Sequence, residues 1–323
     1  MKYRELGKTG IKVSEIGFGT WGIGGETKDG ANSYGATDDA ESLRALRRAF
    51  ELGITFYDTS NIYGYGHAEE LLREAFKNDR EKVVIASKAG FIKHGGPHDI
   101  SPTYIRKCLE ETLMRLGTDY VDLYQLHSPP VELLLQTPES VEELKKMKAE
   151  GKIRAFGFSV KNPKDGIVAI EQFGFETVQV NFNMIDERAL ECGLFASAEK
   201  NGAGIIARTP FGFGFLTGAI KDIHFDPKDH RSTWPEAQLK RWAEAPELFA
   251  PLNAGKDRTL ADLALQFCLS FKPVSAVIPG VLHPSEAQEN SRASGLPPLT
   301  AEEVSAIQEI YKTHEFFDRS LKK

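Results

Sequence analysis

The alternation of short apolar runs with amphipathic segments is the feature that most restricts how this chain can fold. After a hairpin-like opening around 8–10, eight apolar runs follow, and all but the seventh are promptly followed by a helical pattern. Continuous apolar runs are typical of parallel strands covered on both faces. Eight such units favour an α/β fold of the closed (β/α)8, or TIM-barrel, type over an open doubly wound sheet.

The expected elements follow from these patterns. After a first strand that precedes the glycines at 17–22, strands are predicted at 54–57, 82–87, 121–126, 153–158, 177–180, 204–207 and 274–278. Helices are predicted at 42–52, 68–76, 102–116, 139–150, 165–172, 187–200, 260–271, 285–291 and 301–314. Ser101 is the expected N-cap of the helix that starts at Pro102.

The organisation of the chain predicts one domain over residues 1–323, because no Gly/Ser-rich or Pro-rich linker divides it. The N-terminal β-hairpin is expected to close the bottom of the barrel. The polar stretch 219–256, after the seventh strand, is longer than an idle connection usually is. We therefore expect a functional loop there, with some helix of its own.

The composition of the chain restricts the kinds of molecule that it is expected to bind. A hydrophobic content of 41% and a charged content of 27% are values of globular proteins. The net charge of −6 argues against nucleic acid or an anionic membrane as a main partner. Three scattered cysteines without a CxxC motif indicate neither a disulfide framework nor a zinc cluster. The polar start and the lack of a long apolar segment predict a cytoplasmic chain with no membrane partner.

Four ionisable side chains fall at or just after the carboxyl ends of strands two, three and four: Asp58, Tyr63, Lys88 and His127. Catalytic groups of (β/α)8 barrels lie at this end of the strands. Each residue also has a simpler interpretation. Asp58 and Tyr63 occur in a turn-like stretch, Lys88 can be a solvated lysine, and His127 precedes a proline turn. The arrival of all four at one rim from adjacent strands favours a shared site.

Together these groups suit proton delivery to a carbonyl oxygen. A phenol has a pKa of about 10 and is a poor proton donor at neutral pH. A nearby ammonium stabilises the phenolate, and a carboxylate holds that ammonium in place. An imidazole beside the phenol can hydrogen-bond the carbonyl oxygen on which charge develops during reduction. No His, Cys or carboxylate cluster has ligand spacing, so no metal is expected.

The segment 17–22, GFGTWG, matches the G-x-G-x-x-G pattern of dinucleotide-binding folds. That pattern should open a helix, but here it runs into GGETKDGANSYG, which cannot be helical. The acid of the next strand, Asp58, also comes nearly 40 residues later instead of about 20. We expect a loop whose backbone approaches a ligand at the barrel mouth.

The segment 53–69, GITFYDTSNIYGYGHAE, resembles the signature of the aldo-keto reductase superfamily around its catalytic aspartate and tyrosine. It departs at Ala68, where a serine is usual. The stretches KVVIASK, LGTDYVDLYQLH, GKIRAFGFS, VQVNFN, TPFGFGFLTG and VIPGVLHPSEAQEN follow in the family's order over essentially the whole chain. The resemblance implies a catalytic tetrad of Asp58, Tyr63, Lys88 and His127, with Tyr63 as general acid. It also implies a nicotinamide cofactor bound across the barrel mouth.

The resemblance further implies a set of cofactor contacts. They are Thr20, Trp21 and Asp58 near the rim, Ser159 and Gln179 at the carboxamide, Arg208 at the nicotinamide, Thr209, Phe211, Gly212 and Leu216 along the pyrophosphate, and Ile278, Gly280, Gln288 and Asn290 at the adenosine end. Two positions depart from the family pattern. Val160 replaces the asparagine that usually follows the serine, with Asn162 two residues on. Arg208 replaces an aromatic residue that stacks on the nicotinamide.

The adenosine end bears on whether the cofactor is NAD(H) or NADP(H). Many relatives grip the 2′-phosphate with Lys or Arg at positions that here are Gly280, Leu282 and Glu286. Each missing charge-assisted hydrogen bond is worth about 1.5–3 kcal/mol, and Glu286 would repel the phosphate. His283 or Arg292 are the side chains able to compensate. The sequence favours NAD(H), or the use of both cofactors, over strict use of NADP(H).

Three functions are compatible with this pattern. The leading one is hydride transfer between a nicotinamide cofactor and an aldehyde, ketone or sugar carbonyl, or the corresponding alcohol. The others are a Schiff-base lyase using Lys88 and a cofactor-binding regulatory subunit. The expected partner is a small carbonyl, alcohol or sugar, met by the aromatic residues Trp21, Phe91, Phe213 and Trp234. A homo-oligomer is left open.

Overall fold

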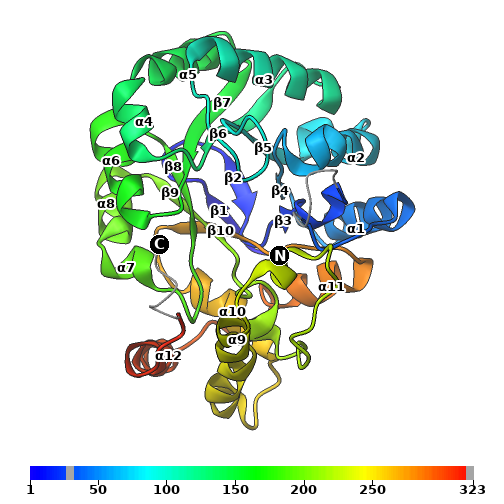
Figure 1. The fold of residues 1–323 in the computed structure, drawn as a ribbon, viewed down its shortest axis with the longest axis vertical. Coiled ribbons are helices and arrows are strands. Elements are labelled where there is room, and N and C mark those ends of the chain that lie inside the picture. The colour runs from blue at the N-terminus through cyan, green and yellow to red at the C-terminus, as the bar shows by residue number, and fades with distance from the viewer. Residues whose placement is uncertain (27–32, 318–323) are drawn as a thin grey trace.

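Within the described residues, 1–26 and 33–317, eight parallel strands of the computed structural model form a ring that helices surround (Figure 1). The strands pair in chain order, the topology of a (β/α)8 barrel. They are β3 (Phe18–Gly19), β4 (Phe56–Asp58), β5 (Val84–Ala89), β6 (Val121–His127), β7 (Ile153–Ser159), β8 (Thr177–Asn181), β9 (Gly204–Arg208) and β10 (Val274–Ile278). The predicted barrel is confirmed.

The ring closes where the last strand meets the first. Single bridges join Ile16 to Val277 and Gly19 to Gly280, and the Gly17 amide donates to the Val277 carbonyl at 2.8 Å. A Cβ on Gly19 would come within 3.1 Å of the Pro279 carbonyl oxygen. A side chain at Gly19 would therefore crowd the point where these two backbones meet.

The predicted hairpin is confirmed and covers the amino-terminal end of the barrel. Strands β1 (Tyr3–Glu5) and β2 (Lys12–Ser14) pair antiparallel. Leu6, Ile11 and Val13 are buried in one cluster with inward-facing barrel residues such as Phe56 and Leu123. This plug leaves only the carboxyl ends of the strands open to a ligand.

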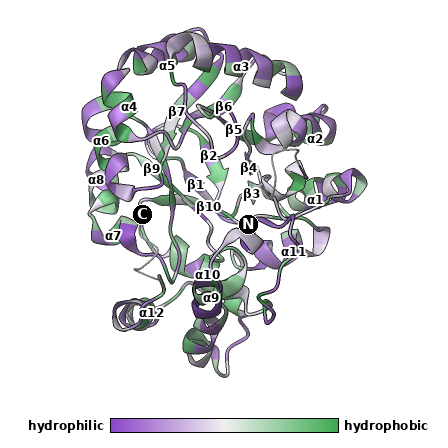
Figure 2. Ribbon diagram, in the orientation of Figure 1, coloured by the Kyte–Doolittle hydropathy of each residue, from purple (hydrophilic) through white to green (hydrophobic). Residues whose placement is uncertain are grey.

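The helices lie outside the barrel, and Figure 2 shows hydrophilic residues on their outer faces. They are α1 (Asp39–Glu51), α2 (His67–Phe76), α3 (Pro102–Leu116), α4 (Val131–Gln136), α5 (Glu139–Ala149), α6 (Pro163–Phe173), α7 (Arg188–Glu191), α8 (Leu194–Asn201), α9 (Glu236–Phe249), α10 (Leu260–Leu269), α11 (Pro284–Arg292) and α12 (Ala301–Thr313). Ser101 caps α3 as predicted, accepting a hydrogen bond from the Tyr104 amide.

The single helix predicted over 187–200 is wrong. The chain forms two helices there, because Gly193 takes a left-handed conformation with φ of +86° between α7 and α8. The short α4, which follows the Pro129–Pro130 turn, was not predicted. We predicted that 24–35 forms no helix, and 27–32 of that stretch lie outside the described residues. Gly24, its first residue, ends the 3₁₀ turn η1 (Gly22–Gly24).

The stretch 219–256 does contain helices of its own, as expected. They are η5 (His230–Thr233), α9 and η6 (Ala250–Asn253), which follow η4 (Phe215–Thr217). This segment joins the connection after β3, because the His230 amide donates to the Ser33 carbonyl at 2.9 Å and Asp229 bridges to Ser33. Two loops distant in sequence therefore meet across one side of the barrel mouth.

Glu187, just before α7, is a buried carboxyl with incomplete hydrogen bonding. Its exposed fraction is 2%, its Oε2 accepts a hydrogen bond from Gln308 at 3.3 Å, and its Oε1 has no partner. Burial, together with the charge of Glu191, raises the pKa of Glu187 to about 7 from 4.5. The folded protein thus holds this proton more tightly than the unfolded chain does. The stability that the proton supplies is lost as the pH rises through about 7.

We predict that Glu187→Gln raises the free energy of unfolding at pH 8 by about 1–3 kcal/mol relative to the unaltered protein. The amide mimics the protonated acid, so the two proteins should differ little at pH 5. Urea unfolding at both pH values measures the difference. Glu309→Gln, on the exposed face of α12, is the matched control. It should change the free energy of unfolding by the same amount at pH 5 and at pH 8. An equal shift for Glu187→Gln at both values would contradict the prediction.

Candidate active site

The rim of the barrel holds a buried ion pair between neighbouring strands β4 and β5. Lys88 Nζ lies 2.5 Å from Asp58 Oδ1, and both side chains are almost fully buried. The ammonium also donates to the Thr59 carbonyl at 2.8 Å and to the Tyr63 hydroxyl at 3.2 Å. Its three donors are therefore all used. The sequence had placed these three side chains at one rim, and the structure brings them into hydrogen-bonding contact.

The charges of this pair are stabilised from both sides. Asp58 Oδ2 accepts hydrogen bonds from the side-chain amides of Gln179 at 2.7 Å and Gln125 at 3.3 Å. Burial acts to lower the pKa of Lys88, but the Asp58 charge and its hydrogen bond outweigh burial, so the pKa is raised. Lys88 is thus an ammonium throughout the physiological pH range, directed at the Tyr63 phenol.

Tyr63 comes from η2 (Tyr63–Gly66), a turn whose backbone is left-handed at three successive residues. Gly64, Tyr65 and Gly66 have φ of +59°, +53° and +100°. A Cβ on Gly64 would lie 2.2 Å from the Gly24 carbonyl oxygen, so only glycine allows this loop to pack against η1. The loop thereby folds back and presents Tyr63 to Lys88.

His127 ends β6 and faces Tyr63 across the cavity. The two rings meet edge to face with centroids 5.8 Å apart, and His127 Nδ1 lies 3.0 Å from the Ser60 hydroxyl. Burial, followed by the charges of Lys88 and Arg208, lowers the pKa of His127 well below its usual value. A neutral imidazole at neutral pH can hydrogen-bond a carbonyl oxygen without adding a charge.

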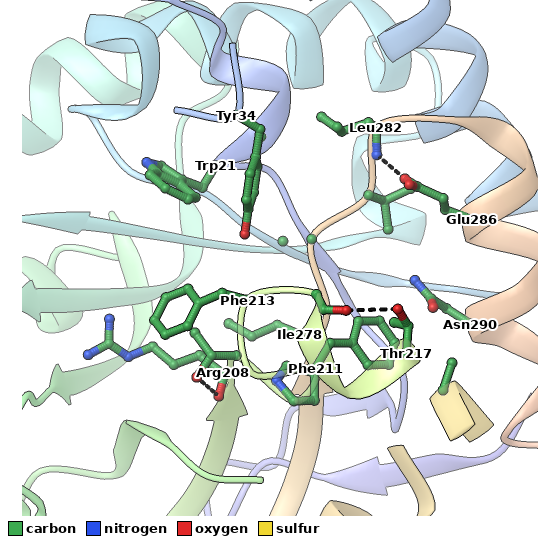
Figure 3. Close-up of a pocket in the computed structure, with 18 of the residues that line it drawn as sticks. Trp21, Tyr34, Arg208, Phe211, Phe213, Thr217, Ile278, Leu282, Glu286 and Asn290 are labelled. Carbon is green, nitrogen blue, oxygen red and sulfur yellow. Dashed lines mark hydrogen bonds between the residues drawn. The ribbon is translucent and has the colours of Figure 1, made fainter. Parts of the chain in front are cut away.

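A cavity of about 930 Å³ opens from these residues along the barrel mouth (Figure 3). The sequence-predicted site residues that line it are Trp21, Asp58, Tyr63, His127, Gln179, Arg208, Thr209, Phe211, Ile278, Gly280 and Asn290. Of the other expected aromatic residues, Phe213 lines the cavity. Phe91 packs on His127 at 4.9 Å between centroids, and Trp234 packs behind Phe213 at 4.5 Å.

Six predicted site residues do not line the cavity. Lys88 lies behind Asp58 and Tyr63. Thr20 donates its hydroxyl to the Asp58 carbonyl, and the Ser159 hydroxyl pairs with that of Ser128 at 3.0 Å. The remaining ones are Gly212, the fully buried Leu216, and Gln288, whose side-chain oxygen accepts a hydrogen bond from Arg48 at 3.1 Å.

The two positions that depart from the family pattern have clear surroundings. Arg208 Nη2 donates to the Val160 carbonyl at 2.8 Å, and Nε has no partner. Asn162, two residues after Val160, caps α6 by accepting from the Lys164 amide, and so does not reach the cavity. The carbonyl of Val160, and not a side-chain amide, is what this segment presents to its neighbour.

Sequence reasoning missed the wall formed where the two long loops meet. Tyr34 lies edge-on to both Trp21 and His230, with centroids 5.0 Å apart in each case, and Arg231 stacks over its ring at 4.9 Å. Asp229 holds that arginine through hydrogen bonds that include one of 2.6 Å. Burial raises the pKa of Tyr34 to about 12. The contacts of Tyr34 with His230 and Arg231 join segments some 200 residues apart, and no local pattern indicates them.

The far end of the cavity is built on α10 and α11. Glu286 lines it while accepting from the Leu282 and His283 amides at 2.6 and 3.2 Å, which caps α11 (Figure 3). Arg292 is paired with Asp257 at 2.8 Å and lies 3.8 Å from Asp262. The amide nitrogen of Asn290 is buried without a partner.

The ion pair makes a test of stability possible. We predict that Asp58→Asn lowers the free energy of unfolding by about 3 kcal/mol, because it leaves the buried Lys88 ammonium without its anion. The free energy of unfolding should fall less in the double variant Asp58→Asn/Lys88→Met than in Asp58→Asn, because the double variant also removes the unpaired charge. Urea unfolding at neutral pH measures both. A double variant less stable than Asp58→Asn would rule out an unpaired charge as the cause.

Within the described residues, no helix combines the length and apolar character needed to cross a membrane.

The chain resembles, over nearly its whole length, a Bacillus subtilis protein, the uncharacterized oxidoreductase YqkF, at 30% identity covering 97% of this chain and 99% of the relative. The NADH-specific methylglyoxal reductase of Escherichia coli is 31% identical, covering 91% and 93%.

Solved structures show the same architecture. The glycerol dehydrogenase AKR11B4 from Gluconobacter oxydans superposes with a TM-score of 0.82 at 28% identity, covering 99% of this chain and 98% of that one. The holo form of the aldo-keto reductase AKR11C1 from Bacillus halodurans gives 0.79 at 28%, covering 96% of each. The model of the Aldo/keto reductase family matches residues 15–312. The chain therefore belongs to the aldo/keto reductase family of oxidoreductases.

Proposed function

We propose that this protein reduces small aldehydes or ketones, sugar carbonyls included, or oxidises the corresponding alcohols, with Tyr63 as the general acid or base and NAD(H) as the preferred cofactor. The observation that carries the proposal is the ammonium of Lys88, shared between Asp58 and the Tyr63 hydroxyl. That arrangement stabilises a phenolate, and it has no evident purpose in a chain that only needs a stable rim.

The residues present fit a nicotinamide dinucleotide. The cavity has a volume of about 930 Å³, and there is open space beside Gly280, because among the described residues a Cβ there would meet only Tyr34 at 4.0 Å. The buried amide nitrogen of Asn290 has no partner among the described residues and can donate a hydrogen bond to a polar group of the ligand. Gln179, Arg208, Thr209 and Phe211 line the nicotinamide and pyrophosphate part under this proposal. When bound, the reduced nicotinamide supplies the hydride.

The protein's own groups manage the proton. Tyr63 donates its hydroxyl proton to the carbonyl oxygen as negative charge develops there, and Lys88 stabilises the resulting phenolate. Neutral His127 orients the same oxygen by a hydrogen bond from the opposite side. Gln125 and Gln179 keep the Asp58 carboxylate on the ammonium, so Lys88 stays charged through the reaction.

We predict that Tyr63→Phe lowers kcat by about 10²-fold or more, because the acid is lost while the ring stays. Cofactor affinity should change less than about twofold, since the hydroxyl lies on the carbonyl side. Turnover is followed by NADH absorbance over a panel of aldehydes, ketones and aldoses, and cofactor affinity by fluorescence titration. A loss of kcat smaller than tenfold would remove Tyr63 as the acid.

The preference for NAD(H) rests on charges at the adenosine end. Asp262, Glu286 and Glu289 line that end, and Arg292, the cation among the described residues there, is already paired with Asp257. His283 lies 3.4 Å from Glu41 instead of facing the cavity as a free cation. A 2′-phosphate would meet carboxylates with little compensation.

We predict a kcat/KM at least about tenfold higher with NADH than with NADPH, the equivalent of one charge-assisted hydrogen bond. Glu286→Gln should reduce that ratio at least about threefold, because the amide can still accept from the capping amides while the charge is gone. Parallel assays with both cofactors measure it. Equal kcat/KM with both in the unaltered protein would contradict the role of Glu286.

The structure weighs against the Schiff-base alternative. A lysine that forms an imine must lose its proton and be free to attack, but Lys88 makes three hydrogen bonds and has a raised pKa. A regulatory subunit would not require the complete tetrad.

The free cysteines Cys108, Cys192 and Cys268 suit a reducing compartment such as the cytoplasm. A homo-oligomer stays a prediction.

A further inference from the structure

Arg208, at the carboxyl end of β9, presents a cation to the cavity without a carboxylate of its own. Its single hydrogen bond goes to the neutral Val160 carbonyl, and Nε has no partner. None of the described acids lies within ion-pairing distance of the guanidinium. The side chain is partly buried, and burial lowers the pKa of Arg208. A desolvated cation without a partner is costly to the fold and is retained where a ligand completes it.

The acids whose fields reach Arg208 are committed elsewhere. Asp58 is bound by Lys88 and by two glutamine amides. Asp186 is held by both arms of Arg188, at 2.7 and 2.6 Å. Neither carboxylate can turn to Arg208 without breaking a pair, so the guanidinium keeps its charge uncompensated inside the protein.

Basic side chains surround the tetrad end of the cavity. The groups that lower the pKa of His127, besides its burial, are Lys88, Arg208, His94 and His98, all basic. Apart from Asp58, which pairs with Lys88, the acids of the cavity wall lie at the opposite end, where Figure 3 shows Glu286 far from Arg208 and Trp21. An acidic chain has thus placed its open positive charge beside the tetrad.

We propose that Arg208 is the binding site for an anionic group on the substrate, a carboxylate or a phosphate, so that the preferred substrates are carbonyl compounds carrying such a group. The inference rests on the function proposed above and specifies its substrate class. The carbonyl oxygen meets Tyr63 and His127, while the anion accepts hydrogen bonds from the N–H groups at the edge of the guanidinium. The planar fork of arginine matches two oxygens of either anion.

Binding without turnover is the first test. Calorimetric titration of the unaltered protein with benzoate, inorganic phosphate and neutral benzamide separates carboxylate from phosphate recognition. Arg208→Met should weaken binding of the recognised anion about 10- to 100-fold, and Arg208→Lys should weaken it less. Benzamide should bind equally to all three proteins. If neither anion binds more tightly than benzamide, or if Arg208→Met changes nothing, the proposal is overturned.

Selectivity is the second test. The ratios of kcat/KM to compare are those of 4-carboxybenzaldehyde to benzaldehyde and of glyceraldehyde 3-phosphate to glyceraldehyde. At least one ratio should exceed one in the unaltered protein and fall about tenfold or more in Arg208→Met. Lys161→Met removes an exposed rim cation, 5.7 Å from the Phe91 ring centre, and is the matched control. Its ratios should stay within about twofold.

The outcomes separate the two proposals. Ratios that fall equally in Lys161→Met and Arg208→Met would show general electrostatic attraction and overturn the assigned site. If the unaltered protein reduces the neutral aldehydes and shows no preference for the anionic aldehyde of either pair, the anion site is also overturned. The proposed reductase function then still stands. If no carbonyl compound is reduced with either cofactor, the proposed function fails, and the calorimetric titration still decides the anion site. Matching unfolding midpoints confirm that the variants are folded.

Discussion

The ion pair between Asp58 and Lys88 is the constraint on which the rim depends. Two unit charges are buried at the ends of adjacent strands, and removing them from water costs several kcal/mol per ion. That penalty is offset only if every donor and acceptor is satisfied. Gln125 and Gln179 complete the carboxylate, and the Thr59 carbonyl takes a second proton of the ammonium. The third ammonium proton is left for Tyr63, so satisfying a buried charge also positions the hydroxyl that we propose as the acid.

A second buried charge supports the tyrosine loop from behind. Glu69, in the first turn of α2, accepts from the Ser87 and Thr112 hydroxyls and from Arg115 at 2.6 Å. Arg115 fills the space beside Gly66, where a Cβ would come within 2.4 Å of its side chain. The glycine, the arginine and the glutamate therefore fix one another, and the position of the loop relative to Lys88 follows from them. Ser87, the neighbour of Lys88 on β5, ties this network to the ion pair.

Much of this could be predicted from the sequence because the determining patterns are local. The apolar runs and their helices define a barrel, and strand ends in a barrel share one rim, so Asp58, Lys88 and His127 were expected together. Tyr57 shows the same logic, since it points outward and donates to the Ile54 carbonyl at 3.0 Å, away from the site. The break at Gly193 was missed because helical spacing continues on both sides of it.

What could not be predicted comes from contacts between distant segments. The pairing of Ser33 with Asp229 and the aromatic wall of Tyr34 and His230 depend on how two irregular loops meet. Neither loop has a period to read. The second role of Gln288 is of this kind too. Its side-chain oxygen accepts a hydrogen bond from Arg48 on α1, which only the packing of α1 against α11 brings within reach.

Under the proposed function, the presence of Arg208 where the family usually has a stacking aromatic residue has a consequence for the direction of the reaction. An aromatic ring provides contact area without charge, whereas a guanidinium provides a plane and a positive charge. Beside an oxidised nicotinamide, which is itself cationic, that charge is repulsive; beside the reduced, neutral ring it is not. Arg208 alone therefore favours the protein loaded with reduced cofactor. In the proposed complex, an anionic substrate at Arg208 offsets this repulsion, so the ring becomes oxidised without the penalty that Arg208 alone imposes.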